Sequence, residues 1–193
     1  MINDFAKLLE DNPFSEIPVD AKTFVEGHEY LGQPPLSPIQ YDIVESMAQI
    51  YRQEDVERHL GSVEGARYYK KFTKGEIIMA LGKGSGKDHT STIGVAYVVY
   101  KLLCLKDPAR YYGKPPGDAI DIINIAINAQ QARNVFFKGF KNKIERAPWF
   151  AGKFYSKMDS IELKKSVTVY SGHSERESHE GLNLFMAVLD EIS

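Results

Sequence analysis

The sequence predicts an α/β fold in which a mainly parallel central sheet is flanked by helices. Short apolar runs suited to buried strands alternate with longer segments of helical character. The chain has 193 residues, which is long enough to bury the core of one ordinary domain. The predicted buried strands are residues 76–81, 119–128 and 184–189, and the helices that follow the first two are residues 88–105 and 130–147.

The segment before the first strand divides into an acidic lead-in and a helix. Residues 1–34 carry seven acidic side chains and two lysines, and beyond a short helix at residues 4–9 we expect them to be irregular. A helix should begin at Pro38 with Ser37 as its cap. Residues 52–72 are charged and contain glycines, which predicts a helix end and a loop. We therefore expect a lead-in over residues 1–34 and a core over residues 35–193.

Two further segments are predicted in the second half of the chain. Residues 106–117, which contain three prolines, are typical of a surface loop. Residues 160–163 and 167–171 alternate between apolar and polar side chains around a Lys-Lys-Ser sequence. This pattern predicts a hairpin, which would add antiparallel strands to the sheet.

The composition excludes several classes of protein. The formal net charge is −2, so the charge of the whole chain indicates neither nucleic-acid binding nor membrane binding. Residues 130–165 are locally basic, and either a solvated helix face or a phosphate-facing surface explains them. Cys104 is the only cysteine, which excludes an intrachain disulfide and favours a buried thiol. We expect neither a signal peptide nor a membrane span, and no recognisable metal site among the histidines.

A glycine-rich segment between the first predicted strand and its helix is the strongest functional signal. Glycines let backbone N–H groups approach an anion, and the N-terminus of the helix adds a positive dipole. Lys87 would reach the β- and γ-phosphates of a nucleotide, and His89 would touch the α-phosphate or face solvent. The candidate nucleotide-binding residues here are Gly82, Lys83, Gly84, Ser85, Gly86, Lys87, Asp88 and His89.

This segment departs from the strict phosphate-loop pattern at both ends. Leu81 stands at the first glycine position, and Asp88 replaces the usual magnesium-binding hydroxyl. A carboxylate can ligate Mg2+ directly or through water. The hydroxyls of residues 90–92 are possible substitutes further along the helix. The alternative is a glycine-rich turn that binds no ligand.

Two adjacent carboxylates, Asp190 and Glu191, follow the last apolar run. Carboxylates at the end of a buried strand are costly unless they have a role. In a phosphate-loop enzyme the first would hold Mg2+ and the second would polarise the attacking water. A cap for a following helix is the alternative for this pair alone. Together with the glycine-rich segment, the pair predicts a P-loop NTPase.

With these two motifs, the chain resembles the ATPase domain of tailed-bacteriophage large terminases, the motors that package viral DNA. The resemblance also covers residues 35–40, where Gln40 looks like an adenine-recognising glutamine, residues 128–133 and residues 179–182. It implies an ASCE-type P-loop fold, ATP and Mg2+ as cofactors, and double-stranded DNA, a portal and a small terminase subunit as partners. It also implies a homo-oligomeric ring, no membrane, and a location in the cytoplasm of the infected bacterial host.

The resemblance leaves two points open. Members of that family usually supply an arginine to the neighbouring subunit just before the glycine that corresponds to Gly181, but Glu180 stands there; Arg176 and then Arg133 are the nearest candidates. The chain also stops soon after Glu191, so we expect a core truncated after the Asp-Glu strand, without a nuclease domain. A helicase-like ATPase acting on nucleic acid, or a nucleotide-binding module inactive in isolation, are the alternatives.

Overall fold

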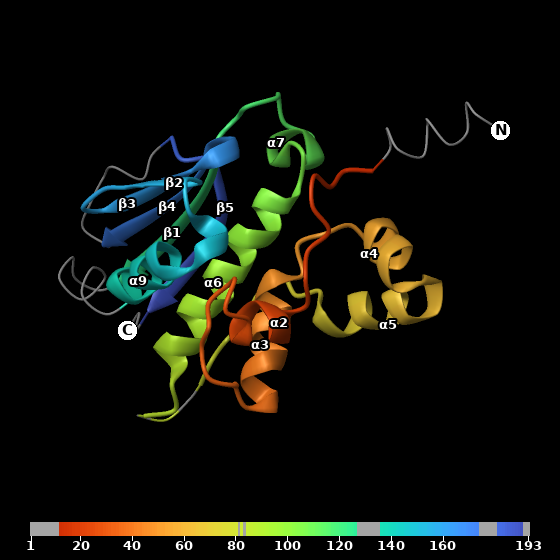
Figure 1. Ribbon diagram of the computed structural model, residues 1–193, viewed down its shortest axis with the longest axis horizontal. Helices are drawn as coiled ribbons and strands as arrows, with labels where there is room; N and C mark the ends of the chain where they lie inside the picture. The colour runs from red at the N-terminus through yellow and green to blue at the C-terminus, as the bar shows by residue number, and fades with distance from the viewer. Residues whose placement is uncertain (1–11, 81, 83, 127–135, 174–180, 191–193) are drawn as a thin grey trace.

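The computed structural model describes residues 12–80, 82, 84–126, 136–173 and 181–190. A five-stranded sheet lies on one side of a long central helix, α6 (Lys87–Cys104), and shorter helices lie on the other side (Figure 1). None of the helices in these described ranges is long and apolar enough to cross a membrane.

The sheet has the strand order β2-β3-β4-β1-β5 and is mixed. β1 (Ile120–Ala126) pairs in parallel with both β4 (Val167–His173) and β5 (Leu184–Asp190). β3 (Ser160–Leu163) pairs antiparallel with β4 and with the short strand β2 (Phe154–Ser156). The prediction of a mainly parallel sheet is therefore wrong, because the hairpin and β2 supply as many antiparallel pairings as there are parallel ones.

The hairpin between β3 and β4 was predicted correctly. Leu163 faces Val167 across the ladder, and the turn between them is the 3-10 segment η3 (Lys164–Ser166). Lys165 and Ser166 have positive φ values of 62° and 59°, so the chain reverses within three residues. The ammonium of Lys165 donates to the carbonyl of Leu103 at 2.7 Å, which ties this turn to the end of α6.

The first predicted strand is absent. The backbone of residues 76–80 is not part of any strand, and the side chain of Ile78 is 81% exposed. Both edges of β1 are already occupied by β4 and β5, so these residues have no free edge of β1 with which to pair. The predicted buried strand at residues 76–81 is therefore wrong for residues 76–80, and Leu81 lies outside the described residues.

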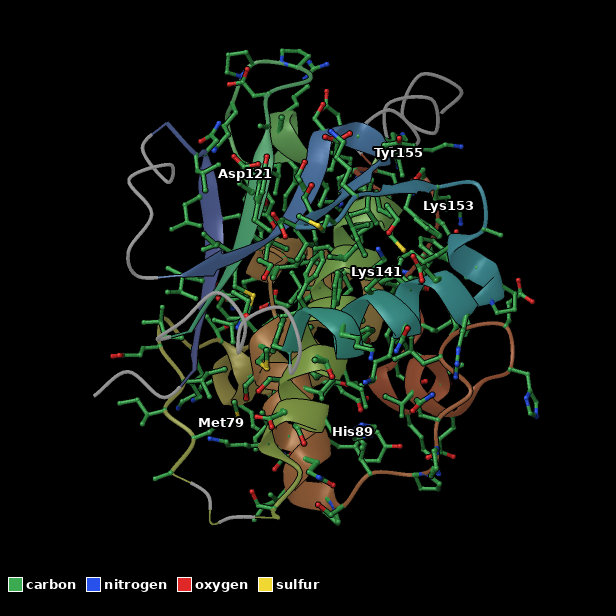
Figure 2. All side chains as sticks on the ribbon, turned by 90° about the vertical axis from the view of Figure 1, so that its left-hand side faces the viewer. Met79, His89, Asp121, Lys141, Lys153 and Tyr155 are labelled. Carbon is green, nitrogen blue, oxygen red and sulfur yellow. The ribbon has the colours of Figure 1, made fainter. Side chains whose placement is uncertain are left out.

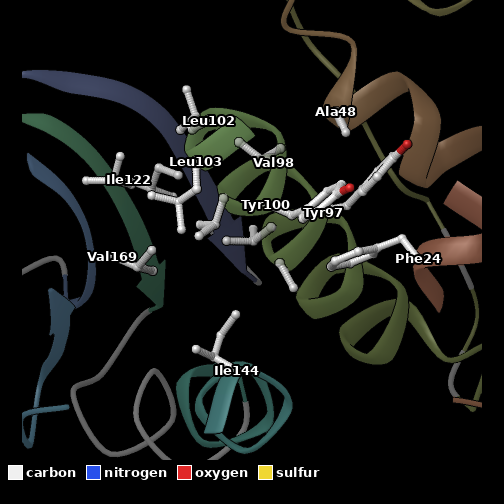
Figure 3. Close-up of a cluster of buried hydrophobic side chains, with 14 of the residues drawn as sticks. Phe24, Ala48, Tyr97, Val98, Tyr100, Leu102, Leu103, Ile122, Ile144 and Val169 are labelled. Carbon is white, nitrogen blue, oxygen red and sulfur yellow. The ribbon is translucent and has the colours of Figure 1, made fainter. Parts of the chain in front are cut away.

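Helix α6 forms the centre of the core, as its apolar sequence predicted. One side packs toward the sheet residues Ile122 and Val169 and toward Ile144 of α9 (Lys138–Arg146) (Figure 3). The opposite side meets Phe24 of α2 (Ala21–Glu26), whose ring stacks on Tyr100 with centroids 4.8 Å apart. Cys104 is buried as expected, and burial raises the pKa of its thiol to about 12.

The N-terminal half contains more helix than predicted. The lead-in includes α2, capped by the carboxylate of Asp20, which accepts the N–H of Thr23. α3 (Pro38–Ala48) begins where expected, with Ser37 as its cap. The predicted loop within residues 52–72 is wrong, since α4 (Gln53–Leu60) and α5 (Ser62–Phe72) fill it.

The charged helices α4 and α5 pack through a few buried positions rather than an apolar stripe. Gly61, with φ of 88°, joins them. A Cβ at Gly65 would lie 2.5 Å from the Cα of Glu57, so only glycine allows this close approach of the two helices. The predicted surface loop at residues 106–117 likewise contains a short helix, α7 (Pro108–Tyr111), with Tyr111 buried. Trp149 and Phe150, in η2 (Pro148–Phe150), are buried in the core.

Candidate nucleotide site

The glycine-rich loop is an exposed turn that leads into α6. Gly84 and Gly86 have φ values of 82° and 77°, a left-handed region that L side chains rarely adopt. The N–H of Ser85 donates to the carbonyl of Gly82 at 3.2 Å. A Cβ added at Gly82 or Gly84 would meet no described atom within 4 Å. The loop backbone therefore has open space beside it for a ligand.

The start of α6 has the electrostatics of an anion site. Gly86 is the N-cap, Lys87 is the first helical residue, and no side chain of the described residues caps the free N–H groups of the first turn. These N–H groups and the helix dipole favour negative charge at this end. Lys87 adds a cation to the same place. The loop leads into the helix as the sequence predicted, and phosphate binding by these residues stays a prediction.

Gln40 lies beside this loop, although it precedes it by more than forty residues in the sequence. A Cβ on Gly86 would be 3.2 Å from Nε2 of Gln40. The amide is held in place by a capping box, in which Oε1 of Gln40 accepts the N–H of Ser37 at 2.9 Å. Nε2 is therefore turned toward the end of the loop, where it can donate to a bound group.

The close packing of α3 on α6 sets this arrangement. A Cβ at Gly94 of α6 would lie 2.4 Å from Sδ of Met47, so the glycine allows the two helices to approach at this point. Gln40 is at the beginning of α3, and Gly86 immediately precedes α6. The contact between Met47 and Gly94 therefore fixes how far Gln40 is from the loop.

A cavity of about 670 Å³ connects the start of α6 with the sheet. Lys87, Asp88 and Ser91 of α6 line one side of the cavity. The other walls are formed by residues 74–79, which precede the glycine-rich loop, and by residues 185–189 of β5. β5 continues from there to Asp190, which is in register with Ala126 of β1.

Figure 2 shows the orientation of this end of the molecule. Met79 and His89 lie toward one end, and Asp121, near the start of β1, lies toward the other. Because β1 and β5 are parallel, the carboxyl ends of both strands are directed toward the end that carries the loop. Ligands of α/β proteins bind at this edge of the sheet.

The hydroxyls that follow Asp88 are engaged by the helix itself. Thr90 donates to the carbonyl of Gly86 at 3.0 Å, and Ser91 donates to that of Lys87 at 2.9 Å. Thr92 donates to the carbonyl of His89 at 2.9 Å, and all three side chains are buried. Asp88, which is half-buried at the cavity wall, is better placed than they are to meet a cation.

His89 is on the first turn of α6 but outside the cavity wall formed by the described residues. Partial desolvation, helped by the positive charge of Lys143 on α9, lowers the pKa of His89. A neutral imidazole at physiological pH gives little electrostatic attraction to phosphate. Its predicted contact with the α-phosphate therefore has no support from its surroundings.

Several predicted site residues lie outside the described residues: Lys83, Arg176, Arg133, Glu191 and the side chain of Asp190. Their roles in binding phosphate, contacting a neighbouring subunit, orienting water and holding Mg2+ stay predictions. Within the described ranges, no group of three or more His, Cys, Asp or Glu side chains could hold a metal ion. A magnesium site built by Asp88 and Asp190 would thus use few protein ligands, as is usual for Mg2+ bound with phosphates.

Asn124 is a site candidate that the sequence analysis did not single out. It is buried in the middle of β1, its Nδ2 reaches the carbonyl of Val188 at 3.5 Å, and its Oδ1 has no hydrogen-bond partner among the described residues. It is in register with Val188 of β5, so it lies at the interface between the two parallel strands. Asn124 and Asp121 are the two polar residues of an otherwise apolar strand, and this was the signal in the sequence that could have marked Asn124.

The basic run at residues 130–165 is largely occupied by contacts within the chain. Lys153 lies 3.2 Å from the centroid of the Trp149 ring. Lys141 donates to the carbonyl of Lys157 at 3.1 Å, and Lys157 pairs with Glu162. Figure 2 shows Lys141 and Lys153 on the same side of the molecule. These contacts favour a structural explanation of the run over a phosphate-facing surface.

Comparison with known proteins places this site in a family. A family model described as "Uncharacterized protein MJ0330, N-terminal P-loop domain" matches residues 2–193. A protein of that name, from Methanocaldococcus jannaschii, is 35% identical over 133 residues, which cover 60% of this chain and 22% of that protein. The chain therefore spans well under half the length of this relative. No solved structure matches it.

Proposed function

This chain belongs to the family described as the N-terminal P-loop domain of MJ0330, and on that premise we propose that it binds ATP with Mg2+ and hydrolyses it. The observation that carries the proposal is the cavity shared by Lys87, Asp88 and β5, because a P-loop enzyme must bring its phosphate-binding lysine to the strand that ends in acidic residues.

Different residues around the cavity bind the phosphates, the Mg2+ ion and the adenine. The free N–H groups at the start of α6 and the ammonium of Lys87 hold the phosphates, and Asp88 with Asp190 holds Mg2+, which neutralises their charge. Gln40 donates from Nε2 to the adenine. Glu191 orients the attacking water. Catalysis of this kind depends on position and electrostatics rather than on a covalent intermediate.

The proposed work of the ATPase is translocation of double-stranded DNA, in a motor similar to a phage large terminase. The support is the set of segments that resemble that family between residues 35 and 191, including Gln40 and the Asp190–Glu191 pair. The partners would be DNA, a portal and a small terminase subunit. In a ring, each copy would supply an arginine to the nucleotide site of its neighbour, and Arg176 is the first candidate for that residue.

Nucleotide binding and phosphate release by Lys87→Ala test the site directly. The variant should lose ATP affinity by roughly 100-fold, equivalent to about 3 kcal/mol, because it removes a charge-assisted contact to phosphate. Lys22→Ala, in the exposed part of α2, removes an equal charge elsewhere and should bind as the parent does. Equal affinity in the two variants would remove Lys87 from the site.

Glu191→Gln separates binding from hydrolysis. The variant should bind ATP with the parent's affinity and release phosphate at a rate lower by roughly 100-fold or more, since a general base or water-orienting group contributes about this much. Hydrolysis at the parent's rate would contradict the role of Glu191. If the parent binds ATP but releases no phosphate even with double-stranded DNA present, the chain is a nucleotide-binding module rather than a motor.

A further inference from the structure

A second cavity, of about 260 Å³, lies beside the C-terminal end of α3. Its walls come from the lead-in, α3, α4, α5 and α6. In Figure 1, α3, α4 and α5 lie on the side of α6 that faces away from the sheet. Among the described residues, Gln49 alone lines both cavities. The volume is just below the range of drug-sized ligand sites, which suits a small metabolite.

The cavity contains a buried cation, Lys101, for which the described part of the chain provides no ion-pair partner. Lys101 of α6 is 4% exposed and lines the cavity. Its Nζ lies 4.5 Å from the ring centroid of Tyr51 and 5.4 Å from that of Tyr97. No carboxylate oxygen of the described residues is within 4.0 Å of Nζ. Aromatic faces compensate a buried ammonium only partly, so an anion entering the cavity would be stabilised there.

Glu45 is the nearest acidic influence on Lys101, but both of its oxygens are in use. Oε1 accepts the N–H of Ala21 at 3.3 Å, and Oε2 accepts the hydroxyl of Tyr68. Burial lowers the pKa of Lys101 to about 8, and the charge of Glu45 opposes that shift. The amine is therefore mostly protonated at neutral pH.

Gln49, which also lines the cavity, has an acceptor that lacks a donor among the described residues. Gln49 is 9% exposed, and its Nε2 donates to the carbonyl of Tyr51 at 3.0 Å. Its Oε1 has no hydrogen-bond partner among the described residues. Glu45 of α3 lies one helical turn before Gln49, the C-cap of that helix, and both line the cavity. Each carboxylate oxygen of Glu45 already accepts one hydrogen bond and can accept a second. A buried acceptor left unpaired is costly, which favours a ligand that donates to it.

Much of the remaining wall is apolar, with Phe14, Val19, Val56 and Leu60 among its residues, and the charged or polar side chains that also line it are Asn12, Asp20, Asp55, Arg58, His59 and Tyr68. A matching ligand has an anionic group for Lys101, a donor close to that group for Gln49 and Glu45, and an apolar body. We propose that this cavity binds an α-amino acid with an apolar side chain, its carboxylate on Lys101 and its ammonium group on the acceptors of α3. The site is separate from ATP binding and does not depend on it.

The test is binding of L-leucine and a panel of other apolar L-amino acids to the purified chain, measured by calorimetry and by the shift in melting temperature. We expect at least one to bind at millimolar concentration. Two analogues of leucine dissect the contact: 4-methylpentanoate lacks the ammonium group, and isopentylamine lacks the carboxylate. Each should bind roughly tenfold or more weakly, since each loses a hydrogen bond to a charged group.

Lys101→Met keeps the length and apolar stem of the side chain and removes the charge. It should abolish amino-acid binding and leave ATP affinity at the parent's value, which separates this site from the nucleotide site. Gln49→Met, which leaves Lys101 in place, should weaken amino-acid binding and is informative even if Lys101→Met does not fold. Failure of the whole panel to bind the parent, or binding of isopentylamine as tight as that of leucine, would overturn the proposal.

Discussion

The two apolar segments that face each other across the nucleotide cavity have similar sequences and different structures. Residues 76–80 read Glu-Ile-Ile-Met-Ala, and β5 reads Leu-Phe-Met-Ala-Val-Leu-Asp. β5 pairs along its length with β1 and buries Val188. Residues 76–80 belong to no strand and expose Ile78.

The difference lies in the neighbours and not in the residues themselves. β5 pairs with β1 on one side, while on its other side the cavity is lined by both β5 and residues 74–79. Leu184 and Leu189 at the two ends of β5 are 53% and 58% exposed. A strand is stable only when a second backbone satisfies its N–H and C=O groups. Residues 76–80 have no such partner strand, and Ile77 is their residue that packs against the core.

The largest expected effect comes from breaking the paired segment. Val188→Asp places a charge in the buried part of β5 and should lower the free energy of unfolding by about 3 kcal/mol or more. The matched change Ile78→Asp alters an exposed residue and should change it by no more than about 0.5 kcal/mol. Urea unfolding followed by circular dichroism measures both. A large loss for Ile78→Asp would mean that residues 76–80 are buried in solution.

A smaller effect is expected from disturbing the packing of α3 on α6. Gly94→Leu drives a side chain into Met47 and should lower the free energy of unfolding by about 1–3 kcal/mol through overpacking. It should also weaken ATP binding, because α3 carries Gln40. The double variant with Met47→Ala makes room and should recover part of both losses. Stability that stays low, with no recovery in the double variant, would show that the two residues do not meet.

Local sequence predicted those elements whose structure is decided locally. Ser37, Pro38 and Gln40 specify the start of α3, and the capping box observed there needs only these side chains. The turn at residues 164–166 set the register of the hairpin. The glycines of the loop and the start of α6 were predicted for the same reason, since positive φ and helix N-termini have strong residue preferences.

The errors occurred where distant parts of the chain decide the structure. Whether residues 76–80 form a strand depends on which edges β1 offers, and no pattern within those residues reports it. α4 and α5 were missed because their charged residues hide the few buried positions that anchor them. The buried hydrogen bonds of Thr90, Ser91 and Thr92 depend on helix packing, and the contact between Gln40 and the loop depends on how α3 meets α6.

The glycine-rich loop provides a third test, with a smaller expected effect. The conformation of Gly86 depends on the backbone preference of the residue at that position, not on pairing with another strand. Gly86→Ala forces an L residue into the left-handed region and should cost about 1–2 kcal/mol of stability. The new Cβ would also approach Nε2 of Gln40, so ATP affinity should fall. Gly82→Ala meets no described atom and should leave stability nearly unchanged. Equal stability losses in the two variants, measured by thermal unfolding, would contradict the left-handed conformation of Gly86.

The smallest change in stability is expected for a substitution at the exposed edge strand β5. Its effect on self-association distinguishes pairing of strand edges from contact between apolar surfaces. Leu189→Lys lies on the exposed part of β5 and should alter the free energy of unfolding by no more than about 0.5 kcal/mol. Because an unpaired edge is a template for another strand, and lysine blocks such pairing, the variant should self-associate less than the parent in sedimentation experiments. Ile78→Lys removes an apolar residue that is more exposed than Leu189, from a segment that is not a strand. If it reduces association as much as Leu189→Lys does, apolar contact rather than strand pairing joins the copies, and the contrast between the two segments has no effect on assembly.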